Sequence, residues 1–79
     1  MGVISVRYFA AAAEAAGVDS EQLDAGPADE VRLAMVARHP ALAAVLSRCA
    51  LLADGVRVDG NDPVAVGVTL DVLPPFAGG

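Results

Sequence analysis

Apolar and polar residues alternate near both ends of the chain, which is the pattern of a strand with one buried face. In residues 3–9, Ile4, Val6 and Tyr8 alternate with more polar neighbours, and a period of two returns in residues 68–72. We therefore predict a first strand and a last strand over these two stretches.

Residues 10–16 favour a short helix directly after the first strand, because they are mostly alanine, a strong helix former. Gly17 follows, and glycine readily takes the left-handed conformation that ends many helices. Residues 19–23 are polar at most positions and predict an edge strand, closed by a turn at residues 25–27.

A second helix is predicted to begin with Pro27 at its first position and to end at His39. Proline is tolerated at the start of a helix, and the residue before Pro40 disfavours the helical conformation. At the end of this helix, His39 is expected to interact with the helix dipole rather than to act as a catalyst. The predicted buried stripe consists of Val31, Ala34 and Met35.

The second half of the chain predicts one more short helix and then β-structure. Residues 42–49 carry an apolar helical face that includes Cys49. Residues 50–53 and 56–58 flank Asp54-Gly55, whose tolerance of positive φ favours a hairpin turn. Residues 59–63 are predicted to be a loop.

The predicted order of elements, with separate helices and a mixed sheet packed against them, places the chain in the α+β class. A length of 79 residues allows one small domain, expected to cover residues 1–79. The hydrophobic fraction of 56% is high for this size, so we expect some apolar surface to stay exposed for a partner.

The charge balance limits the possible partners. With 10 acidic residues against 5 arginines the net charge is −5, which argues against a nucleic-acid ligand. The sequence contains no lysine, so no side chain here accepts an isopeptide link to a like unit. The amino-terminal stretch fits neither a signal peptide nor a membrane span, and we expect a soluble cytoplasmic protein with no membrane partner.

The sequence lacks the motifs of self-contained catalysis. Cys49 is the single cysteine, so we expect neither an intrachain disulfide nor a multi-cysteine metal site, and interpret Cys49 as a small buried apolar residue. No nucleophile has a recognisable base, and no glycine-rich phosphate loop carries a lysine. We expect no metal and no cofactor, and a role as a co-substrate of other enzymes.

The segment Pro74-Pro75-Phe76-Ala77-Gly78-Gly79 has the composition of a tail that enters another protein. Proline stiffens the exit from the last strand, whereas glycine has no Cβ and passes through a narrow slot. The residues beyond Pro75 reach roughly 13 to 14 Å when extended, enough to deliver the Gly79 carboxylate to a partner's active site. Phe76 is expected to be exposed in the free protein and to anchor in the partner. The alternative is a flexible tail without such a role.

Several of these motifs together resemble a known family. Val6-Arg7-Tyr8-Phe9-Ala10, Glu14-Ala15-Ala16-Gly17 and the stretch from Gly67 through the diglycine are similar to the small subunits of molybdopterin synthase. That family and its thiamine-pathway relatives are ubiquitin-like sulfur carriers, so the resemblance implies a β-grasp fold. Two positions depart from the family pattern. Val68 replaces a usual acidic residue after Gly67, and Ala13 replaces a usual basic residue before Glu14.

The resemblance implies that an E1-like enzyme adenylates Gly79 with ATP and that a persulfide donor converts it to a thiocarboxylate. The sulfur would then form the dithiolene of molybdopterin, in molybdenum cofactor biosynthesis, inside the large catalytic subunit of molybdopterin synthase. This chain would be the non-catalytic sulfur donor, with partner contacts at Pro74, Pro75, Phe76, Ala77 and Gly78. Two alternatives stay open. One is a sulfur carrier for thiamine thiazole or cysteine biosynthesis, and the other is a ubiquitin-like modifier of lysines on other proteins.

Overall fold

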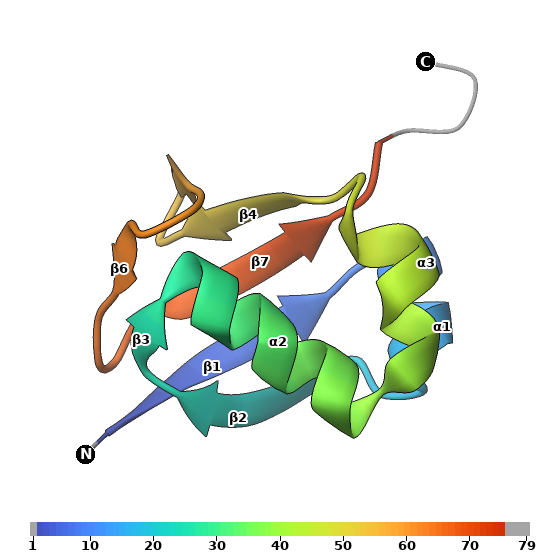
Figure 1. Cartoon of the computed structure of the whole chain (residues 1–79), viewed down its shortest axis with the longest axis horizontal. Helices are drawn as coiled ribbons and strands as arrows, with labels where there is room; N and C mark the ends of the chain where they lie inside the picture. Colours follow the sequence, from blue (N-terminus) through green and yellow to red (C-terminus); the bar gives the residue numbers. More distant parts are fainter. Residues whose placement is uncertain (1, 76–79) are drawn as a thin grey trace.

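The computed structural model describes residues 2–75, and its main feature is a mixed sheet with helices packed against it (Figure 1). Within this part of the chain, five strands lie in the order β2-β1-β7-β4-β5. Their bounds are Val3–Tyr8 for β1, Ser20–Asp24 for β2, Ala50–Ala53 for β4, Val56–Val58 for β5 and Thr69–Leu73 for β7. The α+β prediction with a mixed sheet is confirmed.

The centre of the sheet is a parallel pair formed by the first and last strands. β1 runs beside β7 with Val6 opposite Leu70 and Tyr8 opposite Val72. The pairs β1–β2, β4–β7 and β4–β5 are antiparallel. Because β1 and β7 are parallel, their carboxyl ends lie at the same end of the sheet.

Figure 1 shows α2 across one face of the sheet, with α1 and α3 grouped to one side of it. The bounds are Ala11–Ala16 for α1, Ala28–Arg38 for α2, Pro40–Leu42 for the 3-10 turn η1 and Ala43–Leu46 for α3. The alternation predicted for β1 is confirmed, because its second, fourth and sixth residues are buried. The largest fully buried side chains are Ile4, Val6, Val31, Met35, Leu42, Leu51, Val64, Leu70 and Val72.

A second, two-stranded sheet occupies stretches that were predicted to be a turn and a loop. β3, Gly26–Pro27, pairs antiparallel with β6, Pro63–Val64. Those predictions were wrong at residues 26–27 and 63. Glycine and proline favour turns and loops in the local sequence, but a strand of only two residues requires few backbone N–H donors and therefore tolerates them.

This small sheet holds the amino end of α2 in place. The amide N–H of Ala28 donates to the carbonyl of Asp62, and that of Asp29 donates to the carbonyl of Gly60, both at 2.9 Å. The 59–62 stretch thus supplies backbone acceptors to helix donors that receive no side-chain cap within the described chain. Pro27 was predicted to be the first helical residue. In the structure it precedes the helix as its N-cap.

Other boundaries moved by small amounts. The third predicted helix, residues 42–49, is split into η1 and α3 and ends at Leu46, so Cys49 lies beyond it. The stripe on α2 is confirmed at Val31 and Met35, while Ala34 is half-buried. The positive-φ predictions hold at Gly17, with φ of 75°, and at the Asp54-Gly55 hairpin, with φ of 47° and 86°. None of the helices described within residues 2–75 has the length and apolar character needed to cross a membrane.

Candidate functional site

The predicted tail begins where the central strand ends. β7 stops at Leu73, Pro74 is half-buried and Pro75 is exposed. The other predicted site residues, Phe76, Ala77, Gly78 and Gly79, lie outside the described residues. The structure therefore positions the start of the tail, and the roles of its last four residues stay predictions.

Neighbouring strands fix this exit on both sides. Leu73 lies opposite Ala50 of β4, and Val72 lies opposite Tyr8 of β1. Beyond β1, the amide N–H of Phe9 still donates to the carbonyl of Val72 at 3.3 Å. The chain thus reaches Pro74 from a strand that is hydrogen-bonded along both edges, which gives the exit a defined position and direction.

On the sheet face away from the core, an ion pair joins the two central strands close to the exit. Nε of Arg7 lies 2.7 Å from Oδ1 of Asp71, and Nη2 lies 2.9 Å from Oδ2. The Arg7 guanidinium also lies 5.5 Å from the centre of the Phe9 ring. This bidentate geometry orders Arg7 beside an exposed aromatic ring. The result is a surface with one large apolar side chain and an ion pair near the end of β7.

A hollow of about 470 Å³ lies at the carboxyl end of β1, between the start of α1 and the chain that leads into β2. Phe9, Ala10 and Ala13 contribute to its lining. Ala10 has φ of 50° and ψ of −125°, a conformation that residues with a Cβ rarely adopt. The direct passage from β1 into α1 imposes this strain, and the sequence gives no sign of it.

A cluster of polar side chains that the sequence did not predict lies between β1, β2 and the end of α2. Its centre is Glu21, whose Oε2 accepts from the Tyr8 hydroxyl at 2.5 Å and lies 2.9 Å from Nε2 of His39. Nη1 of Arg38 reaches Oε1 at 3.0 Å. His39 therefore contacts a carboxylate, and its ring also packs edge-on against Tyr8.

Burial and hydrogen bonding act on these groups in opposite ways. Burial, followed by the hydrogen bond to Glu21, raises the pKa of Tyr8, so its hydroxyl stays a donor at neutral pH. Burial alone would raise the pKa of Glu21, but the hydrogen bonds from Tyr8, His39 and Arg38 lower it below its ordinary value. We assign this cluster to the packing of α2 on the sheet edge, because Tyr8 is buried and the Glu21 side chain is only 11% exposed.

Cys49 lies in the core, and Ala13 and Val68 pack against it. Cys49 is buried, its thiol lies 3.4 Å from the carbonyl oxygen of Val45, and burial raises its pKa, which suppresses the thiolate. Its predicted burial is confirmed. Ala13 and Val68, the two positions at which the resemblance implied charged residues, are half-buried and pack against the core.

Comparison with known proteins places these features in a family. A family model described as the ThiS family matches residues 6–79. The molybdopterin synthase sulfur carrier subunit of Chlamydomonas reinhardtii is 32% identical over 81 residues, which cover 96% of this chain and 98% of that protein. The family match includes residues 74–79, so the similarity extends from the sheet through the diglycine.

Solved structures share the fold along nearly the whole chain. SAMP1 from Haloferax volcanii matches with a TM-score of 0.86 at 27% identity, covering 99% of this chain and 100% of that one. A protein–protein complex of subunits 1 and 2 of molybdopterin-converting factor from Helicobacter pylori 26695 contains a chain that matches with a TM-score of 0.71 at 26% identity. That match covers 98% of this chain and 99% of the other. These similarities confirm the expected ubiquitin-like β-grasp fold.

Proposed function

This chain belongs to the ThiS family, and from that premise we propose that it is the sulfur carrier subunit of a molybdopterin synthase. The observation that supports the pathway most directly is the 32% identity, over nearly the whole of both chains, with the sulfur carrier subunit of that enzyme. The exit of the tail from the central strand supports the carrier mode, because the chain becomes exposed at Pro75, two residues after β7 ends.

The proposed chemistry occurs at the carboxylate of Gly79. This group is ionised at neutral pH and unreactive toward sulfur nucleophiles, so it has to be activated by another protein. In the proposed reaction, its oxygen attacks the α-phosphate of ATP on an E1-like enzyme, and pyrophosphate leaves. The terminal sulfur of a persulfide then attacks the acyl carbon and AMP leaves. Cleavage of the sulfur–sulfur bond by a second thiol leaves the thiocarboxylate on Gly79.

Each tail residue has a proposed part in delivering that group. Pro74 and Pro75 restrict the backbone and direct the tail away from β7. Phe76 anchors in the partner, and Ala77 and Gly78 pass through the slot that leads to the reacting atoms. The body of the domain, with the Arg7–Asp71 pair and Phe9 beside the exit, would stay outside the slot.

The proposed partners follow from this sequence of reactions. They are the E1-like adenylating enzyme with ATP, a persulfide donor and the large catalytic subunit, which uses the sulfur for the dithiolene of molybdopterin. The related chain in the Helicobacter pylori structure is in a complex of subunits 1 and 2 of molybdopterin-converting factor, which supports the proposal of a large-subunit partner.

A second candidate function is attachment to other proteins as a modifier. It is favoured by the similarity to SAMP1, a name that stands for small archaeal modifier protein 1. A sulfur carrier for thiamine thiazole or cysteine biosynthesis is the remaining alternative, because it uses the same activation of Gly79. The three candidates differ in what becomes of the activated carboxyl group.

One experiment separates them. The protein is incubated with an E1-like enzyme, ATP and a persulfide donor, and its intact mass is measured before and after the large subunit and the pterin precursor are added. The proposed function predicts exchange of one carboxyl oxygen for sulfur, and then loss of that sulfur as dithiolene forms. An amide between Gly79 and a lysine of another protein would identify a modifier. Thiocarboxylate that forms but is not consumed by the large subunit would identify a carrier for another pathway.

A further inference from the structure

The strand β2 lies at one edge of the sheet, and its outer backbone groups face away from the other strands. The amide of Ala25 donates to the carbonyl of Gly2, and the amide of Tyr8 donates to the carbonyl of Asp19. In an antiparallel pair such bonded residues alternate with residues whose N–H and C=O point outward. With Val6 opposite Glu21, the alternation directs the backbone groups of Ser20, Gln22 and Asp24 to the open edge.

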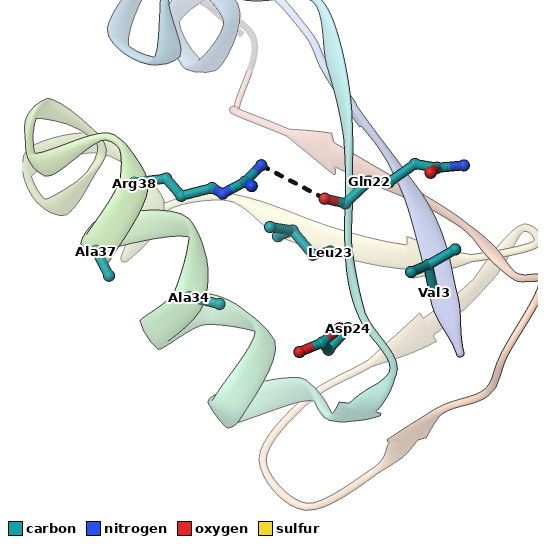
Figure 2. A pocket seen from close by; sticks show the side chains of 7 residues that line it. All are labelled: Val3, Gln22, Leu23, Asp24, Ala34, Ala37 and Arg38. Carbon is teal, nitrogen blue, oxygen red and sulfur yellow. Dashed lines mark hydrogen bonds between the residues drawn. The ribbon is translucent and has the colours of Figure 1, made fainter. Parts of the chain in front are cut away.

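A cavity of about 340 Å³ lies beside this edge, between β2 and α2 (Figure 2). Leu23 from the strand and Ala34 and Ala37 from the helix give it an apolar lining. Leu33 precedes Ala34 on α2 and is 70% exposed, the highest exposed fraction among the large apolar side chains of the described chain. The edge therefore combines unpaired strand geometry with a space for an apolar side chain.

Arg38 bridges this space. Figure 2 shows its side chain extending from α2 to the backbone carbonyl of Gln22, which it reaches at 3.5 Å. That distance is at the limit of a hydrogen bond, whereas the same guanidinium lies 3.0 Å from the Glu21 carboxylate. A strand N–H at ordinary distance would replace the longer contact and leave the Arg38–Glu21 pair in place.

The charge of this edge is negative once that pair is formed. Asp24 has no ion pair among the described residues, and in Figure 2 its side chain extends toward α2. Glu30 lies one turn before Ala34 on the same face of α2, and Asp19 precedes the other end of β2. Two copies of this edge would bring like charges together, which disfavours pairing of the chain with itself.

We propose that the outer edge of β2 and the cavity beside it bind an extended, basic segment of a partner protein as an added strand. Backbone hydrogen bonds form with Ser20, Gln22 and Asp24, and an apolar side chain of the segment enters the cavity. Lysine or arginine side chains two residues before and after that apolar residue share its face of the added strand and lie toward Asp24 and Glu30. This edge is separated from the tail exit by β1, so the inference does not depend on the proposed sulfur transfer.

The test uses the full chain labelled with ¹⁵N and a short blocked peptide with one central valine, lysines two residues before and after it, and threonine at the positions between, so that valine and lysines share one face. We expect saturable shifts centred on the amides of Gln22 and Asp24, with a Kd of about 1 mM or tighter. The same peptide methylated on its backbone nitrogens keeps its charges and loses its strand donors, and its affinity is expected to fall about tenfold or more. A peptide with glutamate in place of lysine is expected to lose affinity to the same extent.

Variants of the protein provide the second arm. Gln22→Pro removes one outward N–H at a position where an edge strand tolerates proline. It is expected to weaken binding of the basic peptide about tenfold. Gln22→Thr keeps the N–H and is expected to keep the affinity. Asp24→Lys is expected to weaken it more than the same charge change in Glu14→Lys, on α1. Equal binding of the methylated peptide, shifts centred on Arg7 and Asp71, or no saturable shift with the basic peptide would each overturn the proposal. If the Gln22 amide became protected from hydrogen exchange as the protein concentration rises, without peptide, the edge would bind a second copy of the chain, and the proposal would also be overturned.

Discussion

Tyr8 on β1 donates a hydrogen bond of 2.5 Å to the Glu21 carboxylate on β2, from the side of the sheet that faces α2. The Glu21 carboxylate also contacts the side chains of Arg38 and His39 at the end of that helix. One carboxylate thus connects the edge of the sheet to the end of its main helix. The connection is electrostatic, so it should depend on pH.

Acid should weaken the fold through Glu21. Burial opposes ionisation of this carboxyl, but its hydrogen bonds prevail and hold the folded-state pKa below the ordinary value of 4.5. A carboxyl with a lowered pKa contributes its full stability above the unfolded-state value, and this contribution is lost as the pH falls through the folded-state pKa. We expect the wild-type melting temperature to fall more steeply than that of Glu21→Gln between neutral pH and about pH 3. Parallel curves in thermal unfolding followed by circular dichroism would contradict the assignment.

Removing the Tyr8 hydroxyl should have a matching effect. Tyr8→Phe keeps the buried ring and removes one donor, so we expect a loss of about 1 kcal/mol in unfolding free energy and a rise in the Glu21 pKa. Denaturant unfolding and NMR titration of the carboxyl carbon measure the two effects. The control is Tyr8→Phe in a Glu21→Gln background, where the loss should be smaller. An equal loss in both backgrounds would mean that the hydroxyl acts through other groups.

Strain at Ala10 predicts a substitution that stabilises the protein. Because its φ of 50° and ψ of −125° disfavour a side chain with a Cβ, Ala10→Gly should raise the unfolding free energy by about 1 kcal/mol. Ala15→Gly, inside α1, is the matched control and should lower it by about 1 kcal/mol. Chemical denaturation measures both variants. Destabilisation by Ala10→Gly would show that this conformation is not strained.

The local signals of the sequence were enough to predict most of the sheet and the carboxyl end of α2, whereas the helix begins one residue later than predicted because Pro27 is its N-cap. Alternation identified β1 and β7, and the Asp54-Gly55 pair identified the hairpin between β4 and β5, because these signals lie within a few neighbouring residues. The β3–β6 pairing joins Gly26 to Val64 across the chain, and neither segment has a strand pattern alone. Its existence depends on where α2 and the 59–62 stretch meet.

The candidate site was predictable in part for the same reason. The composition of residues 74–79 predicted a tail, and the family resemblance implied the reaction in which it takes part. The Arg7–Asp71 and Tyr8–Glu21 contacts could not be predicted in this way, because they depend on the register of β1 against both neighbouring strands. His39 was expected to interact with the helix dipole, and its contact with Glu21 follows from the position of β2 beside the end of α2. Pairs that are distant in sequence have no local pattern.

Phe76 should contribute to partner binding and little to folding. If it anchors in the large subunit, Phe76→Ala should weaken the complex by about 2 kcal/mol while the melting temperature of the free protein stays unchanged. Calorimetric titration and thermal unfolding measure the two quantities. Leu70→Ala is the control for a core loss, because Leu70 is fully buried. A fall in stability for Phe76→Ala comparable to that control, with unchanged affinity, would show that Phe76 belongs to the core.

The position of the Gly79 carboxylate is the central claim, and deletion of Gly79 tests it most directly. The deletion leaves a carboxylate of similar acidity on Gly78 but retracts it by about 3.5 Å. Transfer needs the acyl carbon within about 3 to 3.5 Å of a nucleophile held by another protein. The measurement is the intact mass of the full chain and the shortened chain after incubation with the E1-like enzyme, ATP and a persulfide donor. We predict a thiocarboxylate on the full chain and none on the shortened one, with both folded. Equal thiocarboxylate formation on the two chains would contradict the claim.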